Sequence, residues 1–132
     1  MISLSNTTDQ TVAVGQSITF DTVLLKSKNG AECHRKNSGS FKLCAKCGTY
    51  EVHFAANVTG TPVQLSLAIG GETINESTMI YTPAAANAVG NVSTDIPVAN
   101  CCCDYDRITV VNTGTVPVIV SANPVLFVHR IA

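Results

Sequence analysis

The chain has 132 residues, a mass of 13.8 kDa and a formal net charge of -1 at pH 7. One domain is the expectation at this length. Hydrophobic residues make up 45% of the chain and can fill a core, whereas charged residues are only 13%, about half the usual share. This composition excludes a charge-rich disordered chain and a charge-laced coiled coil, and it predicts no affinity for nucleic acid or an anionic membrane.

The first nine residues contain no Lys or Arg and no apolar run, so they do not predict a signal peptide. No stretch approaches the roughly 20 apolar residues that a membrane-spanning helix needs. We therefore expect a soluble protein that is made without its own export signal.

Apolar and polar residues alternate along most of the chain, which is typical of half-buried strands. In chain order, the runs cover residues 11–15, 17–24, 40–44, 49–58, 63–69, 72–74, 77–82, 91–98, 107–112, 116–121 and 125–131. Residues 26–30 and 36–39 are polar and predict loops, and the Ala-rich residues 84–88 fit either one helical turn or a loop.

The run over residues 49–58 shows the alternation most clearly, because successive strand residues face opposite sides. One side carries Tyr50, Val52, Phe54 and Ala56, and the other carries Glu51, His53 and Ala55. Short runs at this spacing predict an all-β sandwich or jelly roll of about eight to ten strands. The pattern leaves the strand topology open, although an apolar run that reaches the chain's end favours a central last strand.

Three segments resemble the C1q/TNF-like jelly-roll family: residues 17–22, the Gly-x-Tyr-x-Val-x-Phe strand that begins at Gly48, and the hairpin over residues 63–71. The bacterial and phage branch is the most similar part of that family. It includes C-terminal domains of exosporium collagen-like glycoproteins and small proteins of clostridial prophages and gut phages. Residues 77–85, 91–93 and 124–132 resemble the prophage and gut-phage group in particular.

The resemblance implies a two-sheet jelly roll, with residues 1–10 as an N-terminal arm and residues 11–132 as a single domain. It also implies a compact homotrimer whose inward strands supply apolar and aromatic side chains to a threefold interface. Our candidates for core or interface positions are Tyr50, Phe54, Tyr81, Phe127 and His129. Members of this family bind partners and do not catalyse reactions, and this chain lacks the Gly-X-Y repeat of the stalked members.

Six cysteines stand out in a chain of this length. Cys44 and Cys47 form a Cys-x-x-Cys turn, and Cys101 and Cys103 share one side of an extended segment. If the two turns lie at the same end of the sandwich, these four sulfurs meet as a zinc site or as two disulfides, and Cys33 lies in a loop that can reach them. Free, functionally silent thiols are the third alternative, and in that case the protein needs no cofactor.

No motif indicates catalysis. The three histidines, His34, His53 and His129, have no accompanying acid or oxyanion motif, and no Gly-x-Ser-x-Gly is present. A zinc enzyme would need an open metal position with a nearby acid or base, which nothing in the sequence places.

We therefore expect a non-enzymatic component of a phage virion: a trimeric capsid decoration protein, or a head-fibre or binding head on the particle surface after assembly in the host cytoplasm. Its partners are then itself and the major capsid protein or another virion protein. The alternative is a C1q-like head on a bacterial surface or spore coat that binds glycans or host receptors.

Overall fold

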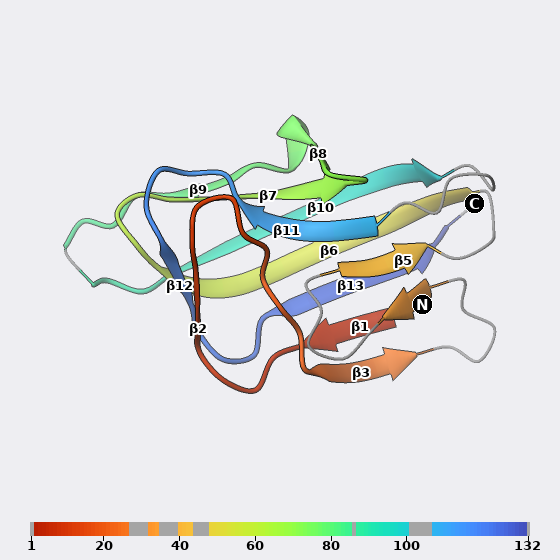
Figure 1. Cartoon of the computed structure of the whole chain (residues 1–132), viewed down its shortest axis with the longest axis horizontal. Helices are drawn as coiled ribbons and strands as arrows, with labels where there is room; N and C mark the ends of the chain where they lie inside the picture. Colours follow the sequence, from red (N-terminus) through yellow and green to blue (C-terminus); the bar gives the residue numbers. More distant parts are fainter. Residues whose placement is uncertain are drawn as a thin grey trace.

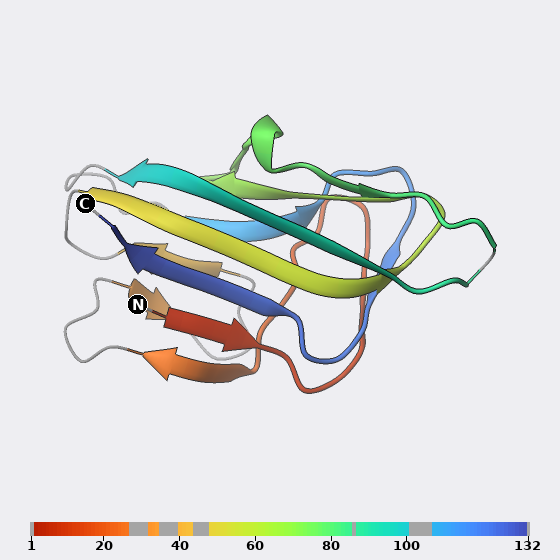
Figure 2. The same ribbon diagram turned by 180° about the vertical axis from the view of Figure 1, so that it is seen from behind.

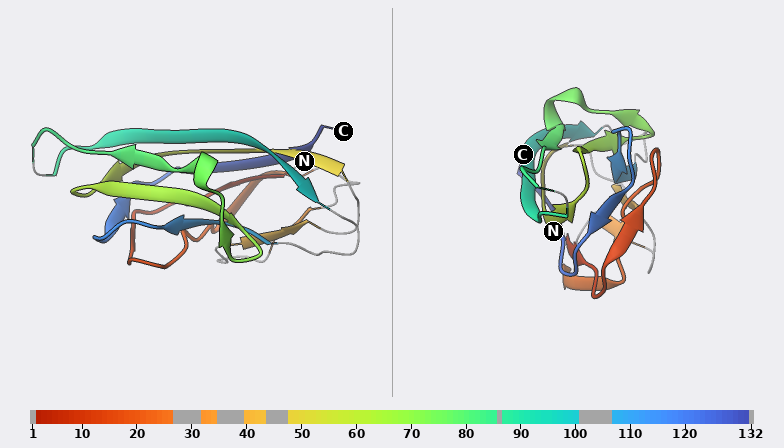
Figure 3. Two further views of the ribbon diagram at one scale, coloured as in Figure 1. Left: turned by 90° about the horizontal axis from the view of Figure 1, so that it is seen from above. Right: turned by 90° about the vertical axis from the view of Figure 1, so that its left-hand side faces the viewer.

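The computed structural model describes residues 2–26, 32–34, 40–43, 48–85, 87–100 and 107–131. The described strands form a seven-stranded and a six-stranded antiparallel sheet, stacked face to face as an elongated sandwich (Figures 1 and 3). The all-β, two-sheet fold predicted from the alternation of apolar residues is confirmed.

The seven-stranded sheet holds the longest strands of the molecule. Its members are β1 (Ile2–Ser5), β2 (Gln10–Val12), β3 (Thr22–Lys26), β6 (Gly48–Thr59), β10 (Gly90–Asn100), β12 (Val118–Val120) and β13 (Val125–Arg130). Their order is β2-β12-β6-β13-β1-β3, and β10 pairs with the free edge of β6. The last strand, β13, lies between β6 and β1, so the expected central position of the chain's last strand is confirmed.

The six-stranded sheet covers one side of the first. It contains β4 (Glu32–His34), β5 (Ser40–Leu43), β7 (Val63–Ile69), β8 (Glu72–Thr73), β9 (Met79–Tyr81) and β11 (Arg107–Asn112). The order is β4-β5-β11-β7-β8, and β9 also pairs with β7. The single described helical element is a 3-10 turn, η1 (Asn75–Ser77), between β8 and β9, and no described helix is long and apolar enough to span a membrane.

The core lies between the two sheets, and its side chains come from the alternate positions of each strand. Its largest fully buried members are Tyr50, Phe20, Phe54, Ile2, Leu4, Ile18, Leu65, Leu67, Ile108 and Leu126. The face of residues 49–58 that begins at Tyr50 is buried, as the alternation predicts, so the opposite face of β6 must point away from the core.

The N-terminal segment differs from the expected arm. Ile2 and Leu4 are completely buried, and β1 pairs with β13 on one side and β3 on the other. Two apolar residues are too short a pattern to reveal a strand, and here β1 forms because two neighbouring strands supply its hydrogen bonds.

Residues 17–24 also depart from the prediction of one continuous strand. Ile18 and Phe20 are fully buried, but the segment forms isolated bridges, one of them between Ser17 and Val111, before β3 begins at Thr22. Alternation of apolar residues is enough to bury these side chains, but a strand also needs a neighbouring strand that pairs with it along its length.

Candidate assembly face

The outer face of the seven-stranded sheet is the side that points away from the core, built by β10, β6, β13, β1 and β3 (Figure 2). We use "outer face" for the outward residues of these strands. They are Thr22, Leu25, Ser3, Ser5, Val125, Phe127, His129, Thr49, Glu51, His53, Ala55, Asn57, Thr59, Asn91, Ser93, Asp95, Pro97 and Ala99.

Strand register brings residues that are far apart in the sequence into rows across this face. In one row Asp95 lies opposite His53, His53 opposite Phe127, Phe127 opposite Ser3, and Ser3 opposite Leu25. Directly opposed residues in antiparallel strands have Cβ atoms about 4.5–5.5 Å apart. The row therefore joins an ionisable half on β10 and β6 to an apolar half on β13 and β3.

Small and apolar side chains continue in the adjacent row, where Val125 lies between Ala55 and Ser5. Ser3 and Ser5 are only 6% exposed although they point away from the core, because their short side chains lie among larger neighbours. At the β3 side, Leu25 is 55% exposed. The surface of this part of the outer face is mostly apolar, so another protein can pack on it.

Two histidine–carboxylate pairs mark the other half of the outer face. His53 Nδ1 lies 4.0 Å from Asp95 Oδ2, and His129 Nε2 lies 4.0 Å from Glu51 Oε2. Each of the four side chains is about one-third to one-half exposed. At 4.0 Å each pair forms an ion pair as soon as the imidazole is protonated, and partial exposure keeps that interaction weak in the separate chain.

His129 is held against Phe127, with ring centroids 5.1 Å apart and planes tilted by 44°. Its Nδ1 atom is buried and has no hydrogen-bond partner. The chain's own atoms therefore cover this nitrogen, and Nε2 is the ring nitrogen that lies near Glu51.

The five residues that the sequence suggested for the core or the interface fall in different places. Tyr50 and Phe54 are completely buried between the sheets, and half-buried Tyr81 packs against the same core from β9. Phe127 and His129 lie half-buried on the outer face. The interface hypothesis therefore concerns only Phe127 and His129.

The partners of these two residues were not among the sequence-based candidates. Glu51 and His53 could have been placed on the outward side from the alternation in residues 49–58. Asp95 could not, because only the register of β10 against β6 sets it opposite His53.

Four of the five candidate cysteines, Cys44, Cys47, Cys101 and Cys103, lie outside the described residues, and of Cys33 the structure describes only its place in β4. The described strand ends that flank both turns do lie at the same end of the sandwich, because Gly48 pairs with Asn100 and Lys42 with Arg107. Within the described ranges, no three His, Cys, Asp or Glu side chains gather as a metal site.

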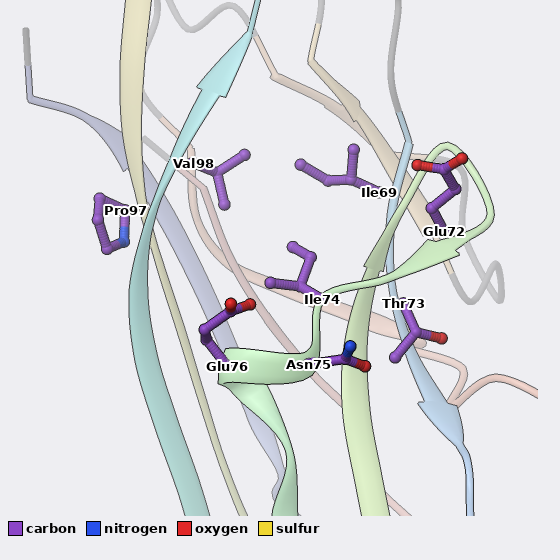
Figure 4. Close-up of a pocket in the computed structure, with 8 residues that line it drawn as sticks. All are labelled: Ile69, Glu72, Thr73, Ile74, Asn75, Glu76, Pro97 and Val98. Carbon is purple, nitrogen blue, oxygen red and sulfur yellow. The ribbon is translucent and has the colours of Figure 1, made fainter.

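A pocket of about 370 Å³ lies beside the β7–β8 hairpin and η1, where they approach β10 (Figure 4). Ile69, Ile74 and Val98 give it an apolar interior, and the carboxylates of Glu72 and Glu76 lie at its rim (Figure 4). Its described lining contains no histidine or cysteine, and no described catalytic pair converges on it.

No protein-family model matches the sequence, and no curated protein matches it. Solved structures do match in fold. The globular domain of zebrafish complement 1qA protein superposes with a TM-score of 0.76 at 14% identity, covering 99% of this chain and 96% of that one. The Eiger TNF from S. frugiperda gives 0.77 at 10% identity, covering 99% and 91%. The fold is therefore a C1q/TNF-like jelly roll, in agreement with the resemblance seen in the sequence.

A third match concerns a different kind of protein. The PRD1 vertex protein P5 superposes with a TM-score of 0.57 at 18% identity, covering 99% of this chain and 96% of that one. At these identities the comparisons show a shared fold, and the role of the present chain has to be argued from its own surface.

Proposed function

We propose that this chain is a non-enzymatic structural protein of a phage virion. It assembles as a homotrimer through its outer face and lies on the particle surface as a capsid decoration protein or as the head of a head fibre. The observation that carries the proposal is the outer face itself, where one row across the strands joins an apolar half at Phe127 to an ionisable half at His53.

The exposed apolar area of the outer face supports the proposed trimer. Phe127, Val125 and Leu25 present apolar area to solvent on one broad face, and burial of such area contributes about 25 cal/mol per Å². Identical chains most often satisfy such a face through closed symmetry, and a C1q/TNF-like resemblance implies threefold symmetry.

The virion role is supported by two independent likenesses. The fold is similar to that of the PRD1 vertex protein P5, and the sequence resembles small proteins of prophages and gut phages. A low share of charged residues, 13%, also suits a protein packed tightly against other subunits. The mechanism is passive: a symmetric interface holds three copies together, and the loops display contacts to the capsid or to a receptor.

Native mass spectrometry tests the trimer. We expect a species at three times 13.8 kDa that persists on dilution into the low micromolar range. A monomer at every concentration would contradict the proposed assembly. The same spectra, recorded with and without a reductant and a chelator, distinguish free thiols, disulfides and bound zinc, because each leaves a different mass.

Proteomics of purified particles tests the location. The protein should co-purify with phage particles in a fixed ratio to the major capsid protein, and an antibody should label intact particles. Recovery from the cell-wall or spore-coat fraction, with none on particles, would instead support the alternative of a bacterial surface head that binds glycans or host receptors.

A further inference from the structure

We infer that the outer face binds further copies of this chain more tightly at mildly acidic pH than at alkaline pH, because His53 and His129 take up protons as the copies meet. The inference rests on the proposed trimer and names what regulates it. It is carried by the placement of two imidazoles and two carboxylates on one face, each imidazole 4.0 Å from its carboxylate.

The charges on this face can be assigned strand by strand. β10 contributes Asp95, β6 contributes Glu51 and His53, and β13 contributes His129. The outward residues of β1 and β3 are Ser3, Ser5, Thr22 and Leu25, which do not titrate. Two further charged groups lie near these strands: Asp21, which accepts a hydrogen bond from the Thr22 hydroxyl, and Arg130, which lies opposite the core residue Tyr50 and so on the other side of β13.

With both imidazoles neutral, the outer face carries the two negative charges of Glu51 and Asp95. With both imidazoles protonated, its net charge is zero. Histidine is the side chain that makes this change between about pH 5 and pH 8. Three copies meeting at alkaline pH would therefore bring together faces of the same sign, whereas at mildly acidic pH they meet as neutral faces.

Desolvation acts in the same direction. In the separate chain, water screens both pairs, since their side chains are about one-third or more exposed. Docking removes that water, and a buried carboxylate is costly unless a positive charge compensates it. Each carboxylate already has an imidazole at 4.0 Å, so proton uptake is the nearest available compensation.

Sedimentation equilibrium of the full chain, over a dilution series at pH 6.0, 7.0 and 8.0 and constant ionic strength, tests the inference. We expect the trimer association constant at pH 6.0 to exceed that at pH 8.0 by at least about tenfold, as linkage requires for net proton uptake. A trimer with the same association constant at all three pH values would overturn the inference and leave the trimer intact. A monomer throughout would overturn both.

Matched variants locate the effect. The double variant His53→Gln/His129→Gln should still form a trimer but lose the pH dependence, and Glu51→Gln/Asp95→Asn should bind as tightly at pH 8.0 as the parent does at pH 6.0. Glu72→Gln/Glu76→Gln is the control, because it removes two carboxylates at the rim of the pocket that do not belong to the outer face. If the control abolished the pH dependence or the histidine variant kept it, the assignment to the outer face would be wrong.

Discussion

Asn112 joins two distant parts of the chain: its Nδ2 atom donates a hydrogen bond to the carbonyl oxygen of Val12, 3.0 Å away and 100 residues earlier in the sequence. The same nitrogen donates to the Val116 carbonyl at 2.9 Å, and Oδ1 accepts from the Gly114 amide at 3.0 Å. Asn112 is completely buried at the end of β11. Its carboxamide thus bonds three backbone groups, through one buried and two part-buried hydrogen bonds.

Replacement of this side chain should be among the most destabilising changes at a polar residue. Asn112→Ala leaves two carbonyls and one amide without their partner, and each unsatisfied buried group costs about 1–3 kcal/mol. We expect the free energy of unfolding to fall by about 3 kcal/mol or more, measured by urea denaturation at fixed protein concentration. Asn91→Ala is the control, since Asn91 bonds to Asn57 at 3.2 Å on the exposed surface, and it should cost less than about 0.5 kcal/mol. Equal costs for the two variants would refute this role of Asn112.

The sequence predicts strands well where the alternation is long. Residues 63–69 and 107–112 form β7 and β11 with the expected bounds, and the run over residues 49–58 lengthens by one residue at each end into β6. In β6 and β7 at least four apolar residues share one side, which is enough to fix both the strand and its buried face. In β11 Ile108 and Val110 share the buried side with Asn112, and the β-branched residues between Arg107 and Asn112 add to the strand signal.

Strands β1 and β4 and the residue pairs on the outer face could not be predicted, because they depend on which strands become neighbours. β1 has only two apolar residues, and β4 (Glu32–His34) has none of the alternation that identifies a strand. The outer face shows the same limit: Phe127 and His53 are 74 positions apart in sequence, and only the pairing of β13 with β6 sets them opposite each other. Alternation assigns a side chain to a face, whereas register decides its partners.

Gly90 and Tyr81 should be energetically coupled. A Cβ atom at Gly90, the first residue of β10, would overlap Cε2 and Cζ of the Tyr81 ring and lie 2.7 Å from Cδ2. We expect Gly90→Ala to cost about 1–3 kcal/mol of unfolding free energy, because the ring must leave its place against the core. In a Tyr81→Ala background, which removes the ring, the same change should cost less than about 0.5 kcal/mol. A Gly90→Ala cost that is the same in both backgrounds would show that the ring is not the obstacle.

Phe127 should be essential for assembly but dispensable for folding. Its side chain is half-buried on the outer face and not in the core, so Phe127→Lys should lower the stability of the monomer by only about 1 kcal/mol. The change removes the aromatic ring from the proposed interface and introduces an ammonium group that assembly must desolvate, so we expect the trimer association constant to fall at least about a hundredfold. Sedimentation velocity and circular dichroism measure the two effects. Ile80→Lys is the matched control, since Ile80 is 67% exposed on β9 of the other sheet, and it should leave the trimer unchanged. A trimer that survives Phe127→Lys would place the interface elsewhere.

Asp21 should contribute to the acid sensitivity of the fold. The Thr7 hydroxyl donates to its carboxylate at 2.6 Å and the Thr22 hydroxyl at 2.7 Å, and the first of these bonds is the main cause that lowers the pKa of Asp21 below its ordinary value of 3.8. Because the pKa is lower in the folded chain, this contribution to stability is present above the ordinary pKa and is lost as the pH falls through the folded value.

The test compares the stability of parent and variant at pH values above and below the range in which the Asp21 contribution is lost. Asp21→Asn should be less stable than the parent at pH 6, and the difference should shrink as the pH falls below the ordinary carboxylate range, as followed by urea denaturation. Thr7→Val removes the leading hydrogen bond and should raise the pKa of Asp21 towards its ordinary value in a carboxyl-carbon NMR titration. An unchanged titration in Thr7→Val would mean that the Thr7 hydroxyl does not hold this carboxylate in solution, and the join between the β1–β2 connection and the start of β3 would then rest on other contacts.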